Sequence, residues 1–212
     1  MCPTFQATGE EYLSTRGRAN IIRAVLEGRL DPGNAPLLSE SLEAALSSCL
    51  SCKACTTECP SNVNMSLLKA ELMHARQRRH GVPFHARLLS RVDLLGKIGS
   101  AFPGTANAFL SFAPFRQLLR KVAHIAPERP LPLYAPERFD RWFKKRTAQK
   151  PKGYRGTILL WDDCFVRHNE PHIGHAAVRI LEAAGFVPKL IEGHACCGRP
   201  AFSMGRLDLA RK

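Results

Sequence analysis

A chain of 212 residues in which 45% are hydrophobic and 23% are charged can bury an ordinary core, which excludes wholesale disorder. Residues Met1–Thr8 lack the basic start and the apolar run of a secretion signal. Together with eight cysteines, this composition indicates a reducing compartment, where thiols serve metals or redox chemistry rather than structural disulfides.

The net charge of +13 is concentrated in the middle of the chain. Residues 61–150 contain 17 Lys and Arg against 5 Asp and Glu, whereas the other residues contain 14 against 13. Such a field attracts nucleic acid, anionic lipid or an acidic protein without selecting among them. The longest uncharged stretch, Ile98–Phe115, is interrupted by Pro103, Gly104, Asn107 and Pro114. It makes a poor membrane-spanning helix and suits a segment that is buried or lies against a surface.

The first 80 residues are predicted to be helical around a cysteine loop. Ser14 or Thr15 can cap a helix over Arg18–Glu27, and a second amphipathic helix is expected over Leu38–Ser47. Cys49–Pro60 forms a loop. The next helix starts at Ser61 or Asn64, and we expect four side chains to face inward and three to face outward: Leu67, Leu68, Leu72 and Met73, against Arg76, Arg78 and Arg79.

Further helices are expected near 87–98, 106–112, 115–125 and 138–147, and the pattern then changes. Thr157–Trp161 and Val187–Ile191 have the β-branched and apolar character of buried strands, with a helix over about Pro171–Ala184 between them and another after Phe202. Strand, helix and strand in this order are the first unit of a parallel sheet. We therefore predict a mostly α chain: a helical cysteine domain over 1–148, a linker over 149–156 and an incomplete α/β domain over 157–212.

The cysteine loop carries the strongest signal in the sequence. Cys49, Cys52, Cys55 and Cys59, followed by Pro60, match C-x2-C-x2-C-x3-C-P without deviation. Three thiolates at this spacing on a tightly turned backbone can bind three irons of one [4Fe-4S] cube. The fourth faces away and, in two-cluster ferredoxins, binds the other cluster. The spacing predicts a [4Fe-4S] cluster.

A structural zinc site is the alternative interpretation. Zinc normally takes two pairs of ligands separated by a longer loop, and four cysteines packed this tightly around one ion would strain the backbone. A disulfide interpretation conflicts with the reducing compartment and with the crowding. A motif match is still a hypothesis, so we keep zinc as the competing prediction.

Cys2 is the predicted fourth ligand of this cluster. If Cys59 serves another cluster, then Cys49, Cys52 and Cys55 need a partner from elsewhere, and Cys2-Pro3 has the same Cys-Pro ending as the motif. On this interpretation Cys2 ends an earlier motif whose first three cysteines lie upstream, and Met1 is an internal methionine. The competing interpretation is a free thiol near the start of the chain.

A second set of cysteines follows the two predicted strands. Cys164 comes after the first strand, and Cys196 and Cys197 come after the second. In α/β sheets chemistry collects at the carboxyl ends of strands, so the intervening helix should bring the three thiols to one sheet edge. This placement favours a metal or redox site over buried apolar thiols.

These residues resemble the iron–sulfur region of FAD-linked oxidases of the D-lactate and D-2-hydroxyglutarate dehydrogenase type, to which the iron–sulfur subunit of glycolate oxidase is related. Similarity is carried by Met1–Phe5, Thr8–Tyr12, Ser14–Ala19, Leu50–Cys55 and Glu58–Val63. Cys164 and Cys196-Cys197-Gly198-Arg199-Pro200 are similar to the cysteine-rich (CCG) domain of those proteins and of heterodisulfide reductase. The resemblance implies a ferredoxin-like helical domain followed by the first part of a CCG domain.

The chain departs from that family in two respects. The flavin domain with its substrate site would lie upstream, and the downstream C-x-x-C that ends the CCG domain is not reached before Lys212. The second departure puts metal binding by Cys164, Cys196 and Cys197 in doubt. No residue of this chain is assigned to catalysis, because hydride chemistry would belong to the flavin part.

By resemblance, the complete protein oxidises a D-2-hydroxy acid at FAD and passes electrons through the clusters to a quinone or cytochrome. The expected partners are a flavin domain or subunit and that acceptor. The expected location is the cytoplasm, with peripheral contact at the cytoplasmic face of the inner membrane as the alternative. A heterodisulfide-reductase-like redox subunit is the alternative. A zinc-dependent nucleic-acid binder is a distant alternative, because the chain lacks paired Cys/His spacing and interleaved aromatic residues, so no nucleic acid is expected.

Arg16 and Arg18 are candidates for tuning the reduction potential of the cluster.

Overall fold

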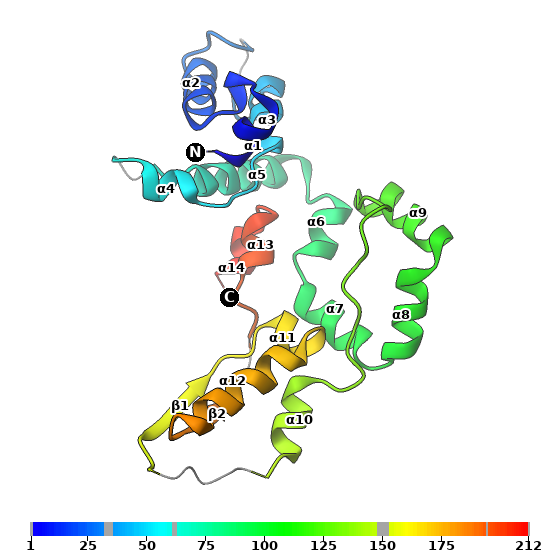
Figure 1. The fold of residues 1–212 in the computed structure, drawn as a ribbon. Helices are drawn as coiled ribbons and strands as arrows, with labels where there is room; N and C mark the ends of the chain where they lie inside the picture. Colours follow the sequence, from blue (N-terminus) through cyan, green and yellow to red (C-terminus); the bar gives the residue numbers. More distant parts are fainter. Residues whose placement is uncertain (1, 32–35, 61–62, 148–152, 194, 212) are drawn as a thin grey trace. The chain divides into compact units, whose positions relative to one another are not determined.

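A computed structural model describes residues 2–31, 36–60, 63–147, 153–193 and 195–211, and the chain divides into two compact units (Figure 1). Unit 1 consists of Met1–Ser90 together with Pro200–Lys212, and unit 2 consists of Arg91–Arg199. The predicted domain boundary near residue 148 stays a prediction. Part of the predicted linker, residues 149–152, lies outside the described residues.

The two longest helices of unit 1 begin at capping side chains. Ser14 Oγ accepts a hydrogen bond from Gly17 N at 2.9 Å, and Asn64 Oδ1 accepts one from Leu67 N at 3.1 Å. These caps fix the start of the two longest helices of the unit, as predicted. The elements are α1 (Pro3–Thr8), η1 (Glu11–Leu13), α2 (Thr15–Leu26), η2 (Pro36–Leu38), α3 (Glu40–Ser47), α4 (Ala54–Glu58), α5 (Met65–His80), α6 (Phe84–Leu89), α13 (Arg199–Ser203) and α14 (Leu207–Ala210).

The core of unit 1 lies between α2, α3 and the start of α5. Val25, Leu42, Leu46 and Met65 are buried there, and the side chain of Cys55 packs against them. Each removes apolar surface from water, worth about 1.5–3 kcal/mol for a Leu, Val or Met side chain. The core therefore lies directly beside the cysteine loop and supports it.

The inward face of α5 differs from the prediction. Leu67 and Leu68 are 42% and 40% exposed, whereas Ser66 and Gln77 are buried. The reason is a long-range contact: α14 and the residues just before it pack on α5, where Gln77 Nε2 donates to the carbonyl oxygen of Met204 at 2.7 Å. The buried side of α5 is consequently set by this returning segment and by α3, rather than by the leucines alone.

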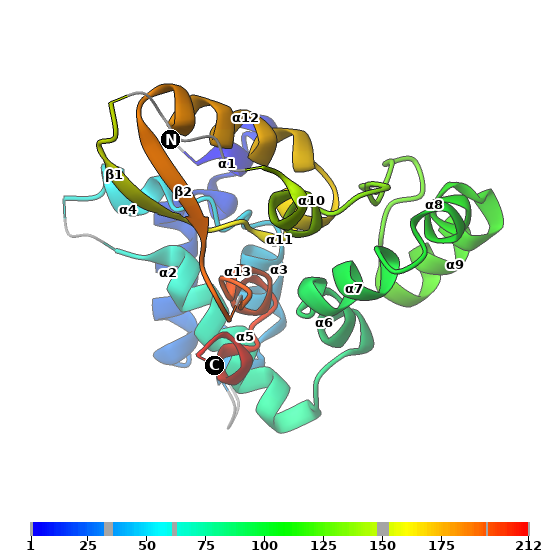
Figure 2. The same ribbon diagram turned by 90° about the horizontal axis from the view of Figure 1, so that it is seen from below.

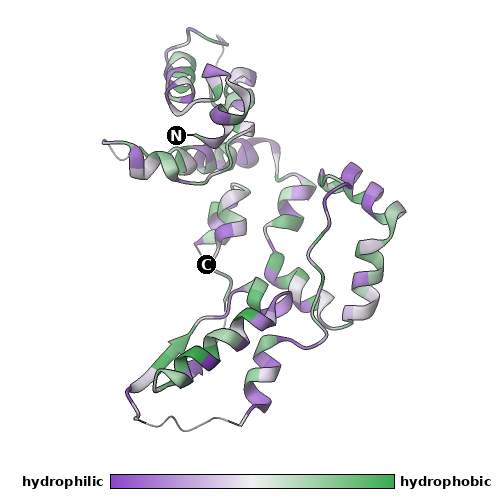
Figure 3. Ribbon diagram, in the orientation of Figure 1, coloured by the Kyte–Doolittle hydropathy of each residue, from purple (hydrophilic) through white to green (hydrophobic). Residues whose placement is uncertain are grey.

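Unit 2 contains the parallel strand pair that the sequence predicts. β1 (Gly156–Leu160) pairs with β2 (Phe186–Leu190) in register Gly156↔Phe186 to Leu160↔Leu190, and α12 (Pro171–Ala183) connects them (Figure 2). The strands are largely hydrophobic (Figure 3). The other elements are α7 (Val92–Gly99), α8 (Pro103–Ser111), α9 (Ala113–Ala123), α10 (Phe139–Lys145) and the short α11 (Cys164–His168).

The core of unit 2 is tight around Phe139 and His168. A Cβ on Gly174 would lie 2.5 Å from the ring of Phe139, and one on Gly96 would lie 2.5 Å from the ring of His168. His168 Nδ1 is also 2.7 Å from Ser100 Oγ, so this buried ring is a packed and hydrogen-bonded core residue. Among the described residues, no helix combines the length and the apolarity needed to cross a membrane.

Gly17 is where α2 passes closest to the backbone before it. A Cβ at this position would overlap the carbonyl oxygen of Glu11 and lie 2.7 Å from Cα of Tyr12. Backbone atoms cannot move away as a side-chain tip can, so we expect Gly17→Ala to lower the free energy of unfolding by about 2–3 kcal/mol. Urea denaturation measures the change.

Gly104→Ala is the matched control, because nothing lies within 4 Å of a Cβ there and the residue is in α8. We expect it to be neutral or to stabilise by up to about 1 kcal/mol. Equal effects of the two substitutions would contradict the close approach at Gly17.

Candidate metal centre

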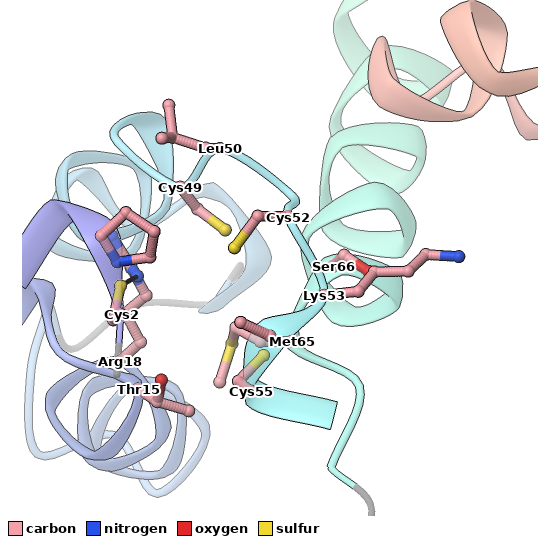
Figure 4. Close-up of a pocket in the computed structure, with 12 residues that line it drawn as sticks. Cys2, Thr15, Arg18, Cys49, Leu50, Cys52, Lys53, Cys55, Met65 and Ser66 are labelled. Carbon is pink, nitrogen blue, oxygen red and sulfur yellow. Dashed lines mark hydrogen bonds between the residues drawn. The ribbon is translucent and has the colours of Figure 1, made fainter. Parts of the chain in front are cut away.

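One cavity of unit 1 is bordered by four cysteines. Cys2, Cys49, Cys52 and Cys55 line this small space together with Arg18 and Met65. In Figure 4 the sulfur atoms of Cys49, Cys52 and Cys55 face this space, and Cys2 lies across it beside Arg18. Cys59 is not among the residues that line the cavity. The structure thus brings together the four thiols that the sequence assigns to one cluster and separates the fifth from them.

The backbone of the cysteine loop explains this selection. Ser51 and Lys53, on either side of Cys52, have left-handed φ angles of 53° and 64°. Such residues cost about 1–3 kcal/mol each and persist only where the surroundings impose them. The two reversals turn the chain back on itself before α4 begins at Ala54.

Cys59 follows α4 in an extended conformation. Its φ is −85° and its ψ is 121°, and its N–H donates to the carbonyl oxygen of Cys55 at 3.1 Å. The chain therefore leaves the turn at this residue, and Pro60 prevents the helix from continuing. This geometry agrees with the expectation that Cys59 faces away from the first three thiols.

Arg18 is a charged group in direct contact with Cys2. Its side chain is 2% exposed, and its Nη1 lies 3.3 Å from Cys2 Sγ. Its Nε donates to the carbonyl oxygen of Ala45 at 2.7 Å and its Nη2 to Ser48 Oγ at 3.2 Å. A buried guanidinium with three partners is held in one orientation, which fixes Cys2 at the rim of the cavity.

The pKa of the Cys2 thiol is lowered from its ordinary value. Burial acts to raise this pKa, but the backbone N–H groups of Phe5 and Thr4 and the guanidinium of Arg18 outweigh it. Hydrogen bonds and a cation favour the thiolate over the thiol. The thiolate is the form that binds metals, so the surroundings of Cys2 suit a ligand better than a bystander.

A second cation, Lys69, reaches the cysteine loop from α5. Its Nζ donates to the carbonyl oxygen of Cys49 at 2.5 Å. Burial lowers the pKa of this ammonium, and the charge of Cys49 opposes that shift. Sequence reasoning missed Lys69. Lys69 lies four residues after Met65, which lines the cavity, and residues i and i+4 share a helix face. This spacing is the sequence feature that could have identified it.

Four cysteines are the donor set that a [4Fe-4S] cube takes, and four of them border this cavity. In a cube each thiolate binds a different iron at a different corner, so four thiols must be spread around a larger volume. The cavity takes its four cysteines from two parts of the chain, Cys2 and the Cys49–Cys55 segment, and Arg18 lines it beside Cys2.

The second cysteine set also lies where the sequence places it. Cys164 is the first residue of α11, which follows β1, and Cys196 and Cys197 follow β2. Burial raises the pKa of Cys164 to about 12, with further contributions from the charge of Cys196 and a hydrogen bond to it. The thiols are therefore neighbours at this sheet edge, and metal binding by Cys164, Cys196 and Cys197 stays a prediction.

We expect Cys164 to be alkylated slowly in the folded protein without metal. A pKa of about 12 in place of 9.0 lowers the thiolate fraction at pH 8 by about a thousandfold. A thiolate of higher pKa is also more nucleophilic, which recovers part of the lost alkylation rate. We therefore expect Cys164 to react about thirtyfold more slowly than an ordinary thiol. Iodoacetamide labelling followed by peptide mass spectrometry measures the rate.

Cys197 serves as the internal reference, because it is exposed in the neighbouring loop. Guanidinium chloride should bring the two cysteines to similar rates. Similar rates in the folded protein would show that the Cys164 thiol is not suppressed by its surroundings.

Comparison with known proteins agrees with this arrangement. Residues 1–63 match the family described as a 4Fe-4S dicluster domain, and residues 158–212 match the family described as a cysteine-rich domain. The first match includes the cysteine loop, and the second includes Cys164, Cys196 and Cys197. The predicted resemblance and the mostly helical fold class are thereby confirmed.

Curated relatives match this chain to different extents. One subunit of the anaerobic glycerol-3-phosphate dehydrogenase from Escherichia coli K12 is 34% identical over 125 residues, which are 59% of this chain and 31% of that protein. D-2-hydroxyglutarate dehydrogenase from the same strain is 23% identical over an alignment of 232 residues, which covers 90% of this chain and 23% of that protein. The probable glycolate oxidase iron-sulfur subunit of Bacillus subtilis 168 is 25% identical over an alignment of 218 residues, which covers 93% of this chain and 46% of that protein.

The chain thus spans 23–46% of the length of these three relatives. No solved structure matches it. The cavity in the 4Fe-4S dicluster region therefore has to be interpreted from its own residues.

Proposed function

We propose that this chain transfers electrons through a [4Fe-4S] cluster bound by Cys2, Cys49, Cys52 and Cys55. The observation that carries the proposal is the cavity bordered by these four thiols, from which Cys59 is excluded. When bound, the cluster supplies one-electron transfer without a change of protein ligands. Cys59 would bind a second cluster together with cysteines from outside this chain, as the dicluster match supports.

The residues around the cavity would bind the cluster and set its environment. Arg18 holds Cys2 in place and contributes positive charge, and Lys69 does the same beside Cys49. Met65 lines the cavity and is part of the buried core, so it keeps water from the inner side. Together these groups stabilise thiolate ligands in partly buried surroundings, which is what a stable cluster requires.

We further propose that the chain is the iron–sulfur part of a flavin-dependent dehydrogenase that acts on a D-2-hydroxy acid. The names of two relatives support this, since one is a D-2-hydroxyglutarate dehydrogenase and another a glycolate oxidase iron-sulfur subunit. FAD would be bound by another domain or subunit, which hands electrons to the cluster. The acceptor would be a quinone or a cytochrome, and the location the cytoplasm.

Anaerobic reconstitution tests the cluster directly. The purified chain is incubated with iron and sulfide under reducing conditions and analysed for iron, zinc and acid-labile sulfide, then by visible absorption and EPR. We expect brown protein with iron and sulfide in equal amounts and an EPR signal after reduction. Stoichiometric zinc without sulfide would overturn the proposal and favour the zinc-dependent nucleic-acid binder.

A further inference from the structure

A second cavity of unit 1 is lined by α3, α5 and the start of α6. Its volume is about 400 Å³, and the described residues that line it differ from those around the four thiols. Its apolar lining includes Leu42 and Leu46 of α3, which are buried, and Leu72 and Met73 of α5, which are half-buried. Sites for small organic molecules have this size and this apolar character. The cavity is therefore large enough for a compact ligand.

The charged side chains around this cavity are mostly basic. Four basic residues line it: Lys69, Arg76, His80 and His85. Among the described residues of the lining, Glu43 is the one carboxylate, and it pairs with Arg76. The side chain of Glu43 is 60% exposed, so this ion pair is weak and an anion entering the cavity can compete for the guanidinium. The charge thus favours an acidic ligand over a cationic one.

Gln77 contributes a buried polar atom to the same cavity. The residue lines the cavity and is 9% exposed, and its Nε2 donates to the carbonyl oxygen of Met204 at 2.7 Å, which fixes the amide. Its Oε1 is buried and has no hydrogen-bond partner among the described residues. Buried carbonyl oxygens are normally paired, because an unpaired one loses its hydrogen bonds to water without replacement. A ligand with an O–H group would supply the missing donor.

The lining also selects an aromatic body over an aliphatic chain. The thioether of Met73 makes favourable contacts with aromatic rings, and the guanidinium of Arg76 is attracted to ring faces as well as to carboxylates. A protein partner is disfavoured, because a stable protein interface buries about 800 Å² on each side and this cavity holds only a compact group. Size, charge and the free acceptor therefore point to a small molecule with three features: a ring, a carboxylate and a hydroxyl.

We propose that the cavity between α3 and α5 binds a small aryl carboxylate that carries a hydroxyl group. The ring would lie on Leu42 and Leu46, the carboxylate would pair with Arg76, and the hydroxyl would donate to Gln77 Oε1. This binding activity goes beyond electron transfer and involves none of the four thiols. It also differs from binding of a D-2-hydroxy acid, which lacks the aromatic body.

Equilibrium dialysis of the full chain against three related probes tests the proposal. We expect para-hydroxycinnamate to bind saturably, with one molecule per chain, and to bind more weakly as salt is added. Cinnamate, which lacks the hydroxyl, should bind about fivefold more weakly, and para-propylphenol, which lacks the carboxylate, at least about tenfold more weakly. D-Lactate should not displace the probe. Equal binding of the three probes, or displacement by D-lactate, would overturn the proposal.

The dialysis is run on the chain before iron and sulfide are added. Its result is therefore independent of the cluster, and either proposal can fail while the other stands.

The variant Q77M tests the contact with the hydroxyl. It also removes the hydrogen bond to Met204, so the quantity compared is the ratio of two affinities measured on the same variant. We expect the preference for para-hydroxycinnamate over cinnamate to fall from about fivefold to about one. A preference that persists in Q77M would show that the hydroxyl does not contact Gln77.

Two pairs of variants test the charges. R76Q should weaken binding of para-hydroxycinnamate by about tenfold, whereas R78Q, which changes an exposed cation of α5 outside the lining, should not. E43Q should strengthen binding by up to about fivefold because it frees Arg76, whereas E40Q, which changes an exposed carboxylate of α3 outside the lining, should not. Equal losses in the two arginine variants, or weaker binding in E43Q, would reject this cavity as the site.

Discussion

Replacement of Cys2 by alanine is expected to remove the cluster, whereas the same replacement of Cys59 leaves it in place. Cys2 lines the cavity although it is 47 positions from Cys49, and Cys59 does not line it although it belongs to the motif. Loss of one of four thiolates should lower cluster affinity by at least about 100-fold, in the same range as Cys52→Ala. Iron and sulfide analysis with EPR after reconstitution measures the outcome.

Cys2 and Cys59 each flank a short helix, Cys2 before α1 and Cys59 after α4. Cys2→Ala removes the contacts of the sulfur with Arg18 and with the N–H groups of Thr4 and Phe5, so any loss of helix is confined to the six residues of α1. Circular dichroism should show nearly the same helix content in both variants. A cluster that survives Cys2→Ala and disappears in Cys59→Ala would contradict the ligand assignment drawn from the cavity.

Arg18→Met is expected to lower the reduction potential of the cluster by on the order of 100 mV. A unit charge about 6 Å away at an effective dielectric constant of about 20 changes the energy of an added electron by about 3 kcal/mol, and losing a cation disfavours reduction. The variant also leaves the carbonyl oxygen of Ala45 and the hydroxyl of Ser48 without their guanidinium donors, so stability should fall. EPR-monitored redox titration gives the potential.

Two further substitutions separate charge from structure. Arg18→Lys keeps the charge but replaces three separate nitrogens, each with its own partner, by one, so it should restore most of the potential and little of the stability. Arg16→Gln is the control, because Arg16 is 79% exposed and paired with Glu11. We expect it to change neither property. A potential that is the same in all three variants would exclude Arg18 as a tuning residue.

Local sequence signals predicted much of the fold correctly. Ser14 and Asn64 cap helices where expected, because capping depends on a side chain and the three residues that follow it. The parallel pair of β1 and β2 was predictable, because two apolar runs separated by a helix have few other ways to pair. Spacing likewise placed Cys49, Cys52 and Cys55 on one cavity.

Long-range contacts account for what the sequence did not predict. Arg16 and Arg18 are equivalent candidates by sequence, and only the meeting of α2 with Cys2, Ala45 and Ser48 distinguishes them. Leu67 and Leu68 were assigned to the core, although the side of α5 that is buried depends on residues 200–212. Neither outcome leaves a periodic pattern in the sequence, because both depend on pairs of residues far apart in the chain.

The return of residues 200–212 to unit 1 has a consequence during synthesis. These residues leave the ribosome after the whole of unit 2, yet Gln77 bonds to Met204 and Gly205 lies against Met73. The helix that follows the cysteine loop therefore stays partly uncovered while unit 2 is being translated. Maturation enzymes that deliver iron and sulfide to a nascent chain would meet a looser cysteine loop than those that act after release.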